Sequence, residues 1–197
     1  MIFRHALASI AILSMAGVAQ AAPVTVQVVG VDGRPLPGAV VTLTLPGTPA
    51  PAVRGPYRVA QQNIAFDPKI LIVPVGAQVS FPNLDRVRHH VYSFSPARKF
   101  DLKLYGRDDS RSITFDKPGP VALGCNIHDG MNGLVYVTAT PFAAVADGEG
   151  RVSFAGAGAG RGTVTVWHPS IRKPGNTLSQ PLAVSTAGAT AVVRLRP

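Results

Sequence analysis

The sequence contains a single cysteine in 197 residues, so it cannot form an internal disulfide. It also lacks the long helical periodicity that a helical bundle needs. After residue 21 it has no apolar run long enough to cross a bilayer, so we expect no stable membrane insertion. Acidic residues are outnumbered 10 to 19 by basic ones, and the net charge is +9.

Short runs of alternating or apolar residues, bounded by glycine, proline and aspartate, recur along the whole chain. Val24 to Val28, for instance, alternates apolar and polar residues as a half-buried strand does. The pattern predicts an all-β fold. No strand is expected in the polar, basic stretch 95–112 or in the Pro/Gly-rich stretch 46–56. Strands are expected at 24–28, 39–45, 70–73, 79–81, 89–94, 113–115, 121–123, 134–137, 151–154, 163–167 and 189–195.

The N-terminus has the layout of a secretory signal peptide. Arg4 and His5 precede a short apolar run that ends at Ala19-Gln20-Ala21, and a charged start, a short apolar core and an A-x-A end are typical of such leaders. We therefore predict a signal peptide at 1–21, cleavage after Ala21 and a periplasmic mature protein; a retained N-terminal anchor is the alternative. A basic protein outside the cytoplasm is expected to meet acidic proteins or anionic membrane surfaces, and no nucleic acid.

Export makes the lone Cys125 informative, because exported proteins usually use cysteines in disulfide pairs. Cys125 opens the motif Cys125-x-x-His128-x-x-Met131. Thiolate, imidazole and thioether are ligands that suit copper, and one Cys, two His and a weak axial Met form the blue-copper ligand set. The motif predicts a metal site; the alternative for Cys125 is a small buried hydrophobic residue.

The fourth ligand is expected upstream, in the pair His89-His90. Neighbouring residues of a strand point to opposite faces, so only one of the two can face the metal. We favour His89, and His90 remains the alternative.

The segment 58–140 resembles the cupredoxins, the blue-copper proteins that include plastocyanin and amicyanin, and in particular those called methylamine utilization proteins. The resemblance rests on Cys125, His128 and Met131 in one loop, with the short, amicyanin-like spacing between the last two. It implies a Greek-key β-sandwich that binds one type 1 copper ion through His89, Cys125, His128 and Met131. His90 stands where the family has an asparagine that links the two ligand loops, so a hydrogen bond between His90 and Asn126 is expected.

The same resemblance implies a carrier of single electrons between redox partners, one of them an acidic protein steered by the basic residues between Arg86 and Lys117. A copper storage or delivery module is the alternative function. An oxidase or reductase is not expected, because that chemistry needs a second copper centre and too few histidines remain. We therefore do not expect an enzyme.

The two ends of the chain resemble the halves of one small sandwich. Residues 24–41 look like the opening of a transthyretin-type, carboxypeptidase-regulatory-like β-sandwich, and the continuation of that pattern comes only after residue 147. Neither half has enough strands to bury a two-sheet core. We therefore predict that a copper domain at 53–140 is inserted into a split domain made of 22–52 and 141–197.

Overall fold

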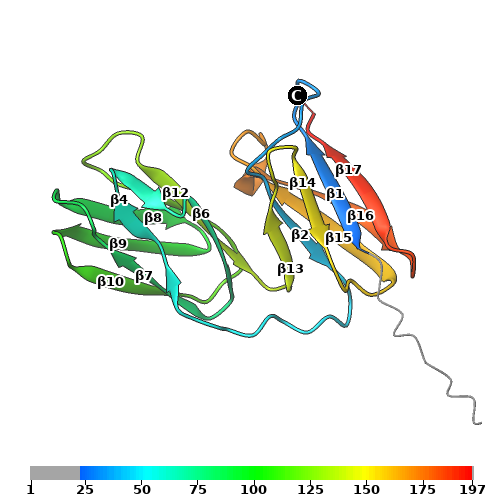
Figure 1. The fold of residues 1–197 in the computed structure, drawn as a ribbon, viewed down its shortest axis with the longest axis horizontal. Coiled ribbons are helices and arrows are strands. Elements are labelled where there is room, and N and C mark those ends of the chain that lie inside the picture. Colours follow the sequence, from blue (N-terminus) through cyan, green and yellow to red (C-terminus); the bar gives the residue numbers. More distant parts are fainter. Residues whose placement is uncertain (1–22, 197) are drawn as a thin grey trace, which may run out of the picture.

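The structure is a computed structural model that describes residues 23–196, and its strands form two lobes (Figure 1). The predicted signal peptide at 1–21 lies outside these residues. The all-β prediction is confirmed: within residues 23–196, seventeen strands are joined by turns, with one short 3-10 helix, η1, at Pro174–Asn176. Among the described residues, no helix is long and apolar enough to span a membrane.

The middle of the chain builds the central lobe, residues 57–138. One of its sheets has the order β10-β7-β3, the other has the order β6-β12-β11-β8-β9, and β4 and β5 form a separate hairpin. The chain passes from β9 to β10 in the opposite sheet and returns with β11 beside β8, a crossover typical of Greek-key sandwiches. The strands are β3 Tyr57–Arg58, β4 Ala60–Gln62, β5 Ala65–Asp67, β6 Ile70–Pro74, β7 Ala77–Pro82, β8 His89–Ser95, β9 Arg98–Tyr105, β10 Ser110–Phe115, β11 Gly119–Gly124 and β12 Asn132–Thr138.

Both ends of the chain build the terminal lobe, which comprises residues 24–44 and 142–194. Its two sheets have the orders β14-β1-β17 and β13-β2-β15-β16. The strands are β1 Val24–Val29, β2 Val40–Thr44, β13 Phe142–Val145, β14 Arg151–Phe154, β15 Gly160–Trp167, β16 Thr177–Val184 and β17 Ala189–Arg194. The pairing of β1 and β2 with strands beyond residue 141 is what a sandwich assembled from both chain ends requires. The domain boundaries themselves stay a proposal.

The chain leaves and re-enters the terminal lobe at neighbouring positions. Leu43, near the end of β2, pairs with Phe142 at the start of β13, so the intervening hundred or so residues begin and end side by side. This is the geometry in which an inserted segment is tolerated.

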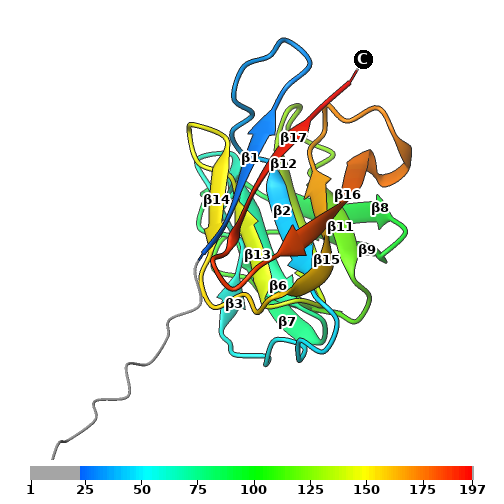
Figure 2. The same cartoon turned by 90° about the vertical axis from the view of Figure 1, so that its right-hand side faces the viewer.

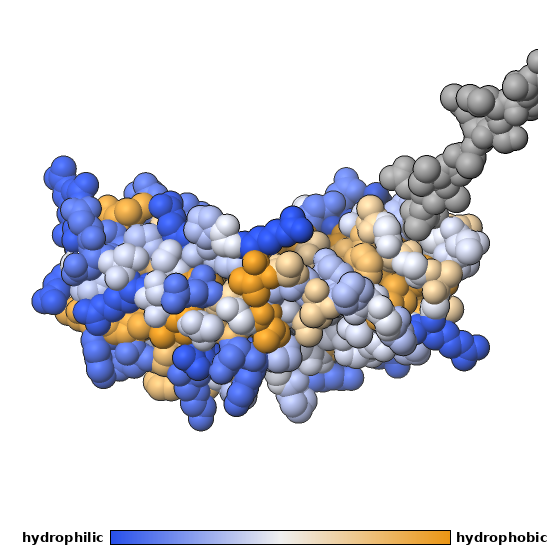
Figure 3. Space-filling model, turned by 90° about the horizontal axis from the view of Figure 1, so that it is seen from below, coloured by the Kyte–Doolittle hydropathy of each residue, from blue (hydrophilic) through white to orange (hydrophobic). Residues whose placement is uncertain are grey.

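A small apolar cluster joins the lobes: Val40 packs with Leu134 and Tyr136 of β12 and with half-buried Trp167. From below, hydrophobic side chains gather near the middle of the molecule (Figure 3).

Alternation positions the core side chains within each strand. In β7, Ala77, Val79 and Phe81 are fully buried while Gln78 faces outward, as the two-residue period of a strand demands. The lobes have separate cores, one around Val121 and Val135 and one around Val41 and Val164.

The expectation that 95–112 holds no strand is wrong. β9 and the start of β10 lie there, and Phe100, Leu102 and Tyr105 turn toward the core while lysines face outward. Lys103 has a φ of 58°, which interrupts the alternation so that Tyr105 rather than Leu104 is buried. Outward lysines are common on edge strands, where they discourage pairing with other chains, and here they gave the segment a loop-like composition.

Candidate metal centre

A closed loop carries the cysteine. Residues 125–131 connect β11 to β12, which pair with each other in antiparallel register. The Cys125 N–H donates to the Met131 carbonyl at 3.2 Å, and the Met131 N–H donates to the His128 carbonyl at 3.2 Å. Gly130 has a φ of +81°, a left-handed conformation that suits glycine. These features curl the loop so that its side chains converge.

The upstream histidine comes from the neighbouring strand. β8 lies beside β11, with Tyr92 paired to Gly124. This pairing brings the start of β8 next to the loop, and His89 there is fully buried.

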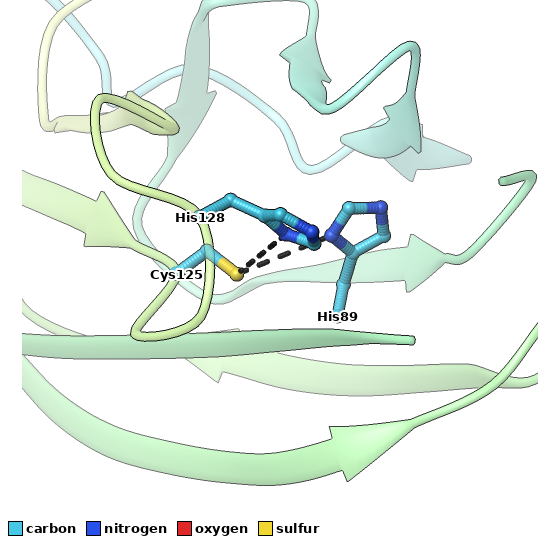
Figure 4. A group of neighbouring side chains, drawn as sticks. All are labelled: His89, Cys125 and His128. Atoms are coloured by element: carbon cyan, nitrogen blue, oxygen red, sulfur yellow. Dashed lines mark hydrogen bonds between the residues drawn. The ribbon is translucent and has the colours of Figure 1, made fainter. Parts of the chain in front are cut away.

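Cys125, His89 and His128 form a single cluster (Figure 4). The Cys125 Sγ lies 3.7 Å from His128 Nδ1 and 4.0 Å from His89 Nδ1, and the two imidazole rings are 4.8 Å apart between centroids. For zinc, an ion that takes the same donors, bonds of about 2.3 Å to sulfur and about 2.0 Å to nitrogen put the two atoms about 3.7 Å apart at a trigonal angle. The cluster therefore has the spacing of three donors that share one ion.

Asp85 fixes the orientation of His89. Its carboxylate lies 2.8 Å from His89 Nε2 and also accepts the N–H groups of Asn63, at 2.7 Å, and Ile64, at 2.9 Å. Burial raises the pKa of Asp85, but these three hydrogen bonds outweigh it and hold the pKa below the ordinary value. Because the carboxylate can only accept, His89 donates from Nε2, which leaves the Nδ1 lone pair facing Cys125.

His90 faces the other side of β8. Its Nε2 lies 2.5 Å from Asp101, whose other carboxylate oxygen accepts from the Lys103 ammonium at 2.6 Å. The hydrogen bonds of Lys103 and His90 lower the pKa of Asp101. The expected bond from His90 to Asn126 is not among the hydrogen bonds of residues 23–196. The structure thus brings His89, and not His90, to the cluster.

The four predicted ligands differ in exposure. His89 is fully buried, Cys125 is 8% exposed and Met131 is 5% exposed. Met131 packs in the same apolar core as Cys125. His128 is half-buried and is flanked by exposed Ile127 and Asp129, so it is the donor of the cluster nearest to solvent.

Sequence reasoning missed the supporting role of Asp85 and Asn83. Asn83 is fully buried; its amide donates to the Val87 and Tyr105 carbonyls, and its Oδ1 accepts the Asp85 N–H at 2.9 Å. The last contact is the turn that an asparagine forms with the residue two positions on. The sequence Asn83-Leu84-Asp85 therefore contained a signal for this turn, and Asp85 stands four residues before His89.

Comparisons with known proteins gave only likenesses of structure. No family model matches the sequence, and no curated protein is similar to it. A purple cupredoxin from Nitrosopumilus maritimus is 24% identical over 42% of this chain and all of its own, with a TM-score of 0.39. A reduced amicyanin variant is 25% identical over 49% of this chain and 99% of its own, with a TM-score of 0.39. A copper-containing nitrite reductase from Thermus scotoductus SA-01 is 29% identical over 48% of this chain but only 25% of its own, with a TM-score of 0.41.

The fold and the cluster define the class of the central lobe. A β-sandwich gathers one cysteine and one histidine from a hairpin loop and a second histidine from the adjacent strand. Residues 57–138 thus have the architecture and donor set of a cupredoxin, and the cofactor that fits this donor set is one type 1 copper ion.

Proposed function

We propose that this protein is a periplasmic carrier of single electrons that holds one copper ion through His89, Cys125 and His128, with Met131 as the weak axial ligand. The observation that carries the proposal is the preformed cluster of three donors, two of them buried. Bound copper would supply the chemistry by alternating between Cu(I) and Cu(II).

The residues around the cluster favour fast electron transfer, because they hold the donors still. Asp85 locks the His89 ring, and two backbone hydrogen bonds close the loop that carries Cys125 and His128. A site whose donors are fixed in advance rearranges little when the charge of the ion changes. His128, the half-buried donor, would be the exit for the electron.

The alternative, a copper storage or delivery module, would use the same donors but release the ion to a partner. Such exchange needs donors that an incoming ligand can reach. His89 and Cys125 are covered by the protein, and this burial favours the carrier. One ion also suffices for a carrier, whereas an oxidase or reductase would need a second centre, and we propose no enzymatic activity.

The two functions can be separated by mixing the loaded protein with a copper chelator while it is repeatedly reduced and reoxidised. A carrier keeps its copper through many cycles and exchanges electrons rapidly between its own oxidised and reduced forms. A delivery module would pass most of its copper to the chelator within a few cycles, and that result would contradict the proposal.

The partner is proposed to be an acidic redox protein. Eight cationic residues lie between Arg86 and Lys117, and three of them already pair with carboxylates: Arg98 with Asp116, Lys103 with Asp101 and Arg107 with Asp108. Arg86 and Arg88, just before His89, are exposed and form no ion pair with any described residue. If they steer the partner, the bimolecular transfer rate will fall with ionic strength as the screening length shortens; a flat profile would argue against steering.

A further inference from the structure

The ribbons of β16 and β17 diverge from the turn that connects them (Figure 2). A groove of about 560 Å³ in the terminal lobe is lined by residues of both strands. The two strands are joined by the turn Ser185–Gly188, but they belong to different sheets of the sandwich. Leu178 of β16, Ile171 and Leu195 form apolar walls between them. The groove is therefore the unclosed edge of a β-sandwich.

Both strands that flank the groove are edge strands. Within residues 23–196, β17 pairs only with β1 and β16 pairs only with β15. The Val192 carbonyl of β17 points toward β16, since it accepts from the Gln180 side chain at 3.5 Å. Pro181 lies within β16 and removes a donor from that strand. An unpaired edge presents backbone groups that can bind another extended segment, and β17 is the better template of the two.

The groove also has a strongly positive rim. Arg172, Lys173, Arg194 and Arg196 line it, and none of the other described residues that line it carries a carboxylate. Among the described residues none of these four cations forms an ion pair. The carboxylates of the terminal lobe are engaged elsewhere: Glu149 pairs with Arg151 at 3.3 Å, and Asp32 and Asp147 accept backbone N–H groups of their own turns.

We propose that this groove is a docking site for an extended peptide segment of a partner protein, in which acidic side chains alternate with apolar ones. The segment would add to the free edge of β17 through backbone hydrogen bonds, which is the strand-addition mode of peptide recognition. Alternate side chains of an added strand face opposite ways. The apolar side chains would pack against the apolar walls of the groove, and the acidic side chains would lie next to the cations of its rim. An anionic membrane would satisfy the cations alone and leave the backbone edge unpaired.

The site is independent of the copper cluster, because its lining residues all lie between 171 and 196. Its failure would leave the proposed electron carrier untouched, and the reverse also holds.

The test uses the mature copper-loaded protein and an eight-residue peptide that alternates glutamate and valine, capped at both ends and labelled with a fluorophore. Fluorescence anisotropy should show binding of this peptide, and binding should weaken with added salt. A matched peptide of lysine and valine should not bind. A third peptide, with the acidic sequence but an N-methyl group on every backbone amide between its residues, should bind at least tenfold more weakly, because it has no backbone N–H left to donate to a strand edge.

Two charge-reversal variants complete the test. Arg172→Glu with Arg194→Glu should weaken binding of the acidic peptide about tenfold or more, since each change replaces an attraction at the rim by a repulsion. Arg34→Glu with Arg161→Glu changes the net charge equally but lies outside the groove, and should change affinity less than twofold.

Three outcomes would overturn the proposal. They are no binding of the acidic peptide at millimolar concentration, equal binding of the N-methylated peptide, and binding of phosphatidylglycerol vesicles without binding of the peptide. Equal binding of the N-methylated peptide would mean that the groove binds any flexible polyanion. Binding of vesicles alone would mean that this surface faces a membrane. The N-methylated peptide tests the unaltered protein, so the result does not depend on whether a variant folds.

Discussion

The two lobes differ in what they bury. The core of the terminal lobe consists of valine, alanine, leucine, isoleucine and phenylalanine, with Thr42 as its buried polar residue. The central lobe has an apolar core of similar size, but it also buries five polar side chains; these are Gln61, Asn83, His89, His90 and Ser93. Thr138 and Thr140 are also buried, at the connection between the lobes: the Thr138 hydroxyl donates to the Thr140 carbonyl, and the Thr140 hydroxyl donates to the Leu43 carbonyl of β2.

A buried polar group lowers the stability of the fold unless it has a hydrogen-bond partner. The central lobe, which carries the metal cluster, therefore depends on the hydrogen bonds of its buried polar side chains more than the terminal lobe does. Gln61 donates to the Tyr105 hydroxyl at 2.6 Å, and Tyr105 donates to the Phe81 carbonyl at 2.8 Å. Burial raises the pKa of Tyr105 to about 12, so its hydroxyl stays protonated and continues to donate. These groups, with Asn83 and Asp85, hold β9 and the segment before β8 in place around His89, which pairs with Tyr105 across the sheet. Among the described residues, the terminal lobe has no such buried polar network.

The largest effect should come from removing the thiolate. Cys125→Ser should lower copper affinity more than about 100-fold, beyond the loss usual for residues that only support a ligand. Competition titration with a copper chelator measures this. Ser93→Ala, which changes a buried polar residue of the same lobe outside the cluster, is the control and should leave the affinity within twofold. Similar losses in both variants would mean that copper binding reflects general integrity of the lobe.

Next in size is the loss of the buried amide. Asn83→Ala should destabilise the metal-free protein by about 3 kcal/mol, because the Val87 and Tyr105 carbonyls and the Asp85 N–H lose their partner inside the protein. Thermal or urea unfolding of the metal-free form measures it. Asn132→Ala removes an exposed asparagine with one bond to the Gly130 carbonyl and should change stability by less than about 0.5 kcal/mol. Equal effects would mean that the buried amide of Asn83 supports the structure no more than an exposed amide does.

A smaller effect separates the two carboxylates that face neighbouring histidines. Asp85→Asn should weaken copper binding about 10-fold to 100-fold, because an amide in either orientation supports the His89 ring less well than a carboxylate fixed by two backbone N–H groups. Asp101→Asn, which alters the partner of His90, should change the affinity less than threefold. If Asp101→Asn weakened copper binding more than Asp85→Asn did, the result would identify His90 rather than His89 as the ligand.

The smallest effect concerns the independence of the central lobe. The fragment 53–140 should fold and bind copper with unchanged affinity, because its core and all the predicted ligands lie within it. It should be less stable than the whole chain by about 2 kcal/mol, since Leu134 and Tyr136 lose their cover from the terminal lobe. Urea unfolding followed by circular dichroism measures this, and a fragment that fails to fold would contradict the split-domain proposal.

Much of the site could be anticipated from local sequence. Cys125, His128 and Met131 lie within seven residues, and strand alternation alone gave a reason to separate His89 from His90. The partners of these residues could not be anticipated in the same way. Asp85 reaches His89 only because the turn begun by Asn83 folds back, and Asp101 meets His90 across a strand pair with an irregular register.

The fold shows the same division. Strands with clear apolar alternation, such as Val24 to Val28, could be predicted from the sequence. β9 could not, because its outward-facing lysines gave it the composition of a loop. The first part of β16 was missed for a related reason: Leu178 and Gln180 face inward at the open edge of the sandwich and are only half-buried, whereas Val184 at the end of the strand is buried. Long-range pairing decides such strands, and local pattern does not encode it.

The visible absorption spectrum of the mature protein loaded with Cu(II) tests the central claim most directly. A thiolate and two imidazoles around one copper ion predict an intense charge-transfer band in the red region, of equal strength in the whole chain and in the fragment 53–140. Weak absorption alone, with copper bound at one ion per chain, would show that Cys125 does not ligate the metal and would contradict the assignment of a type 1 site.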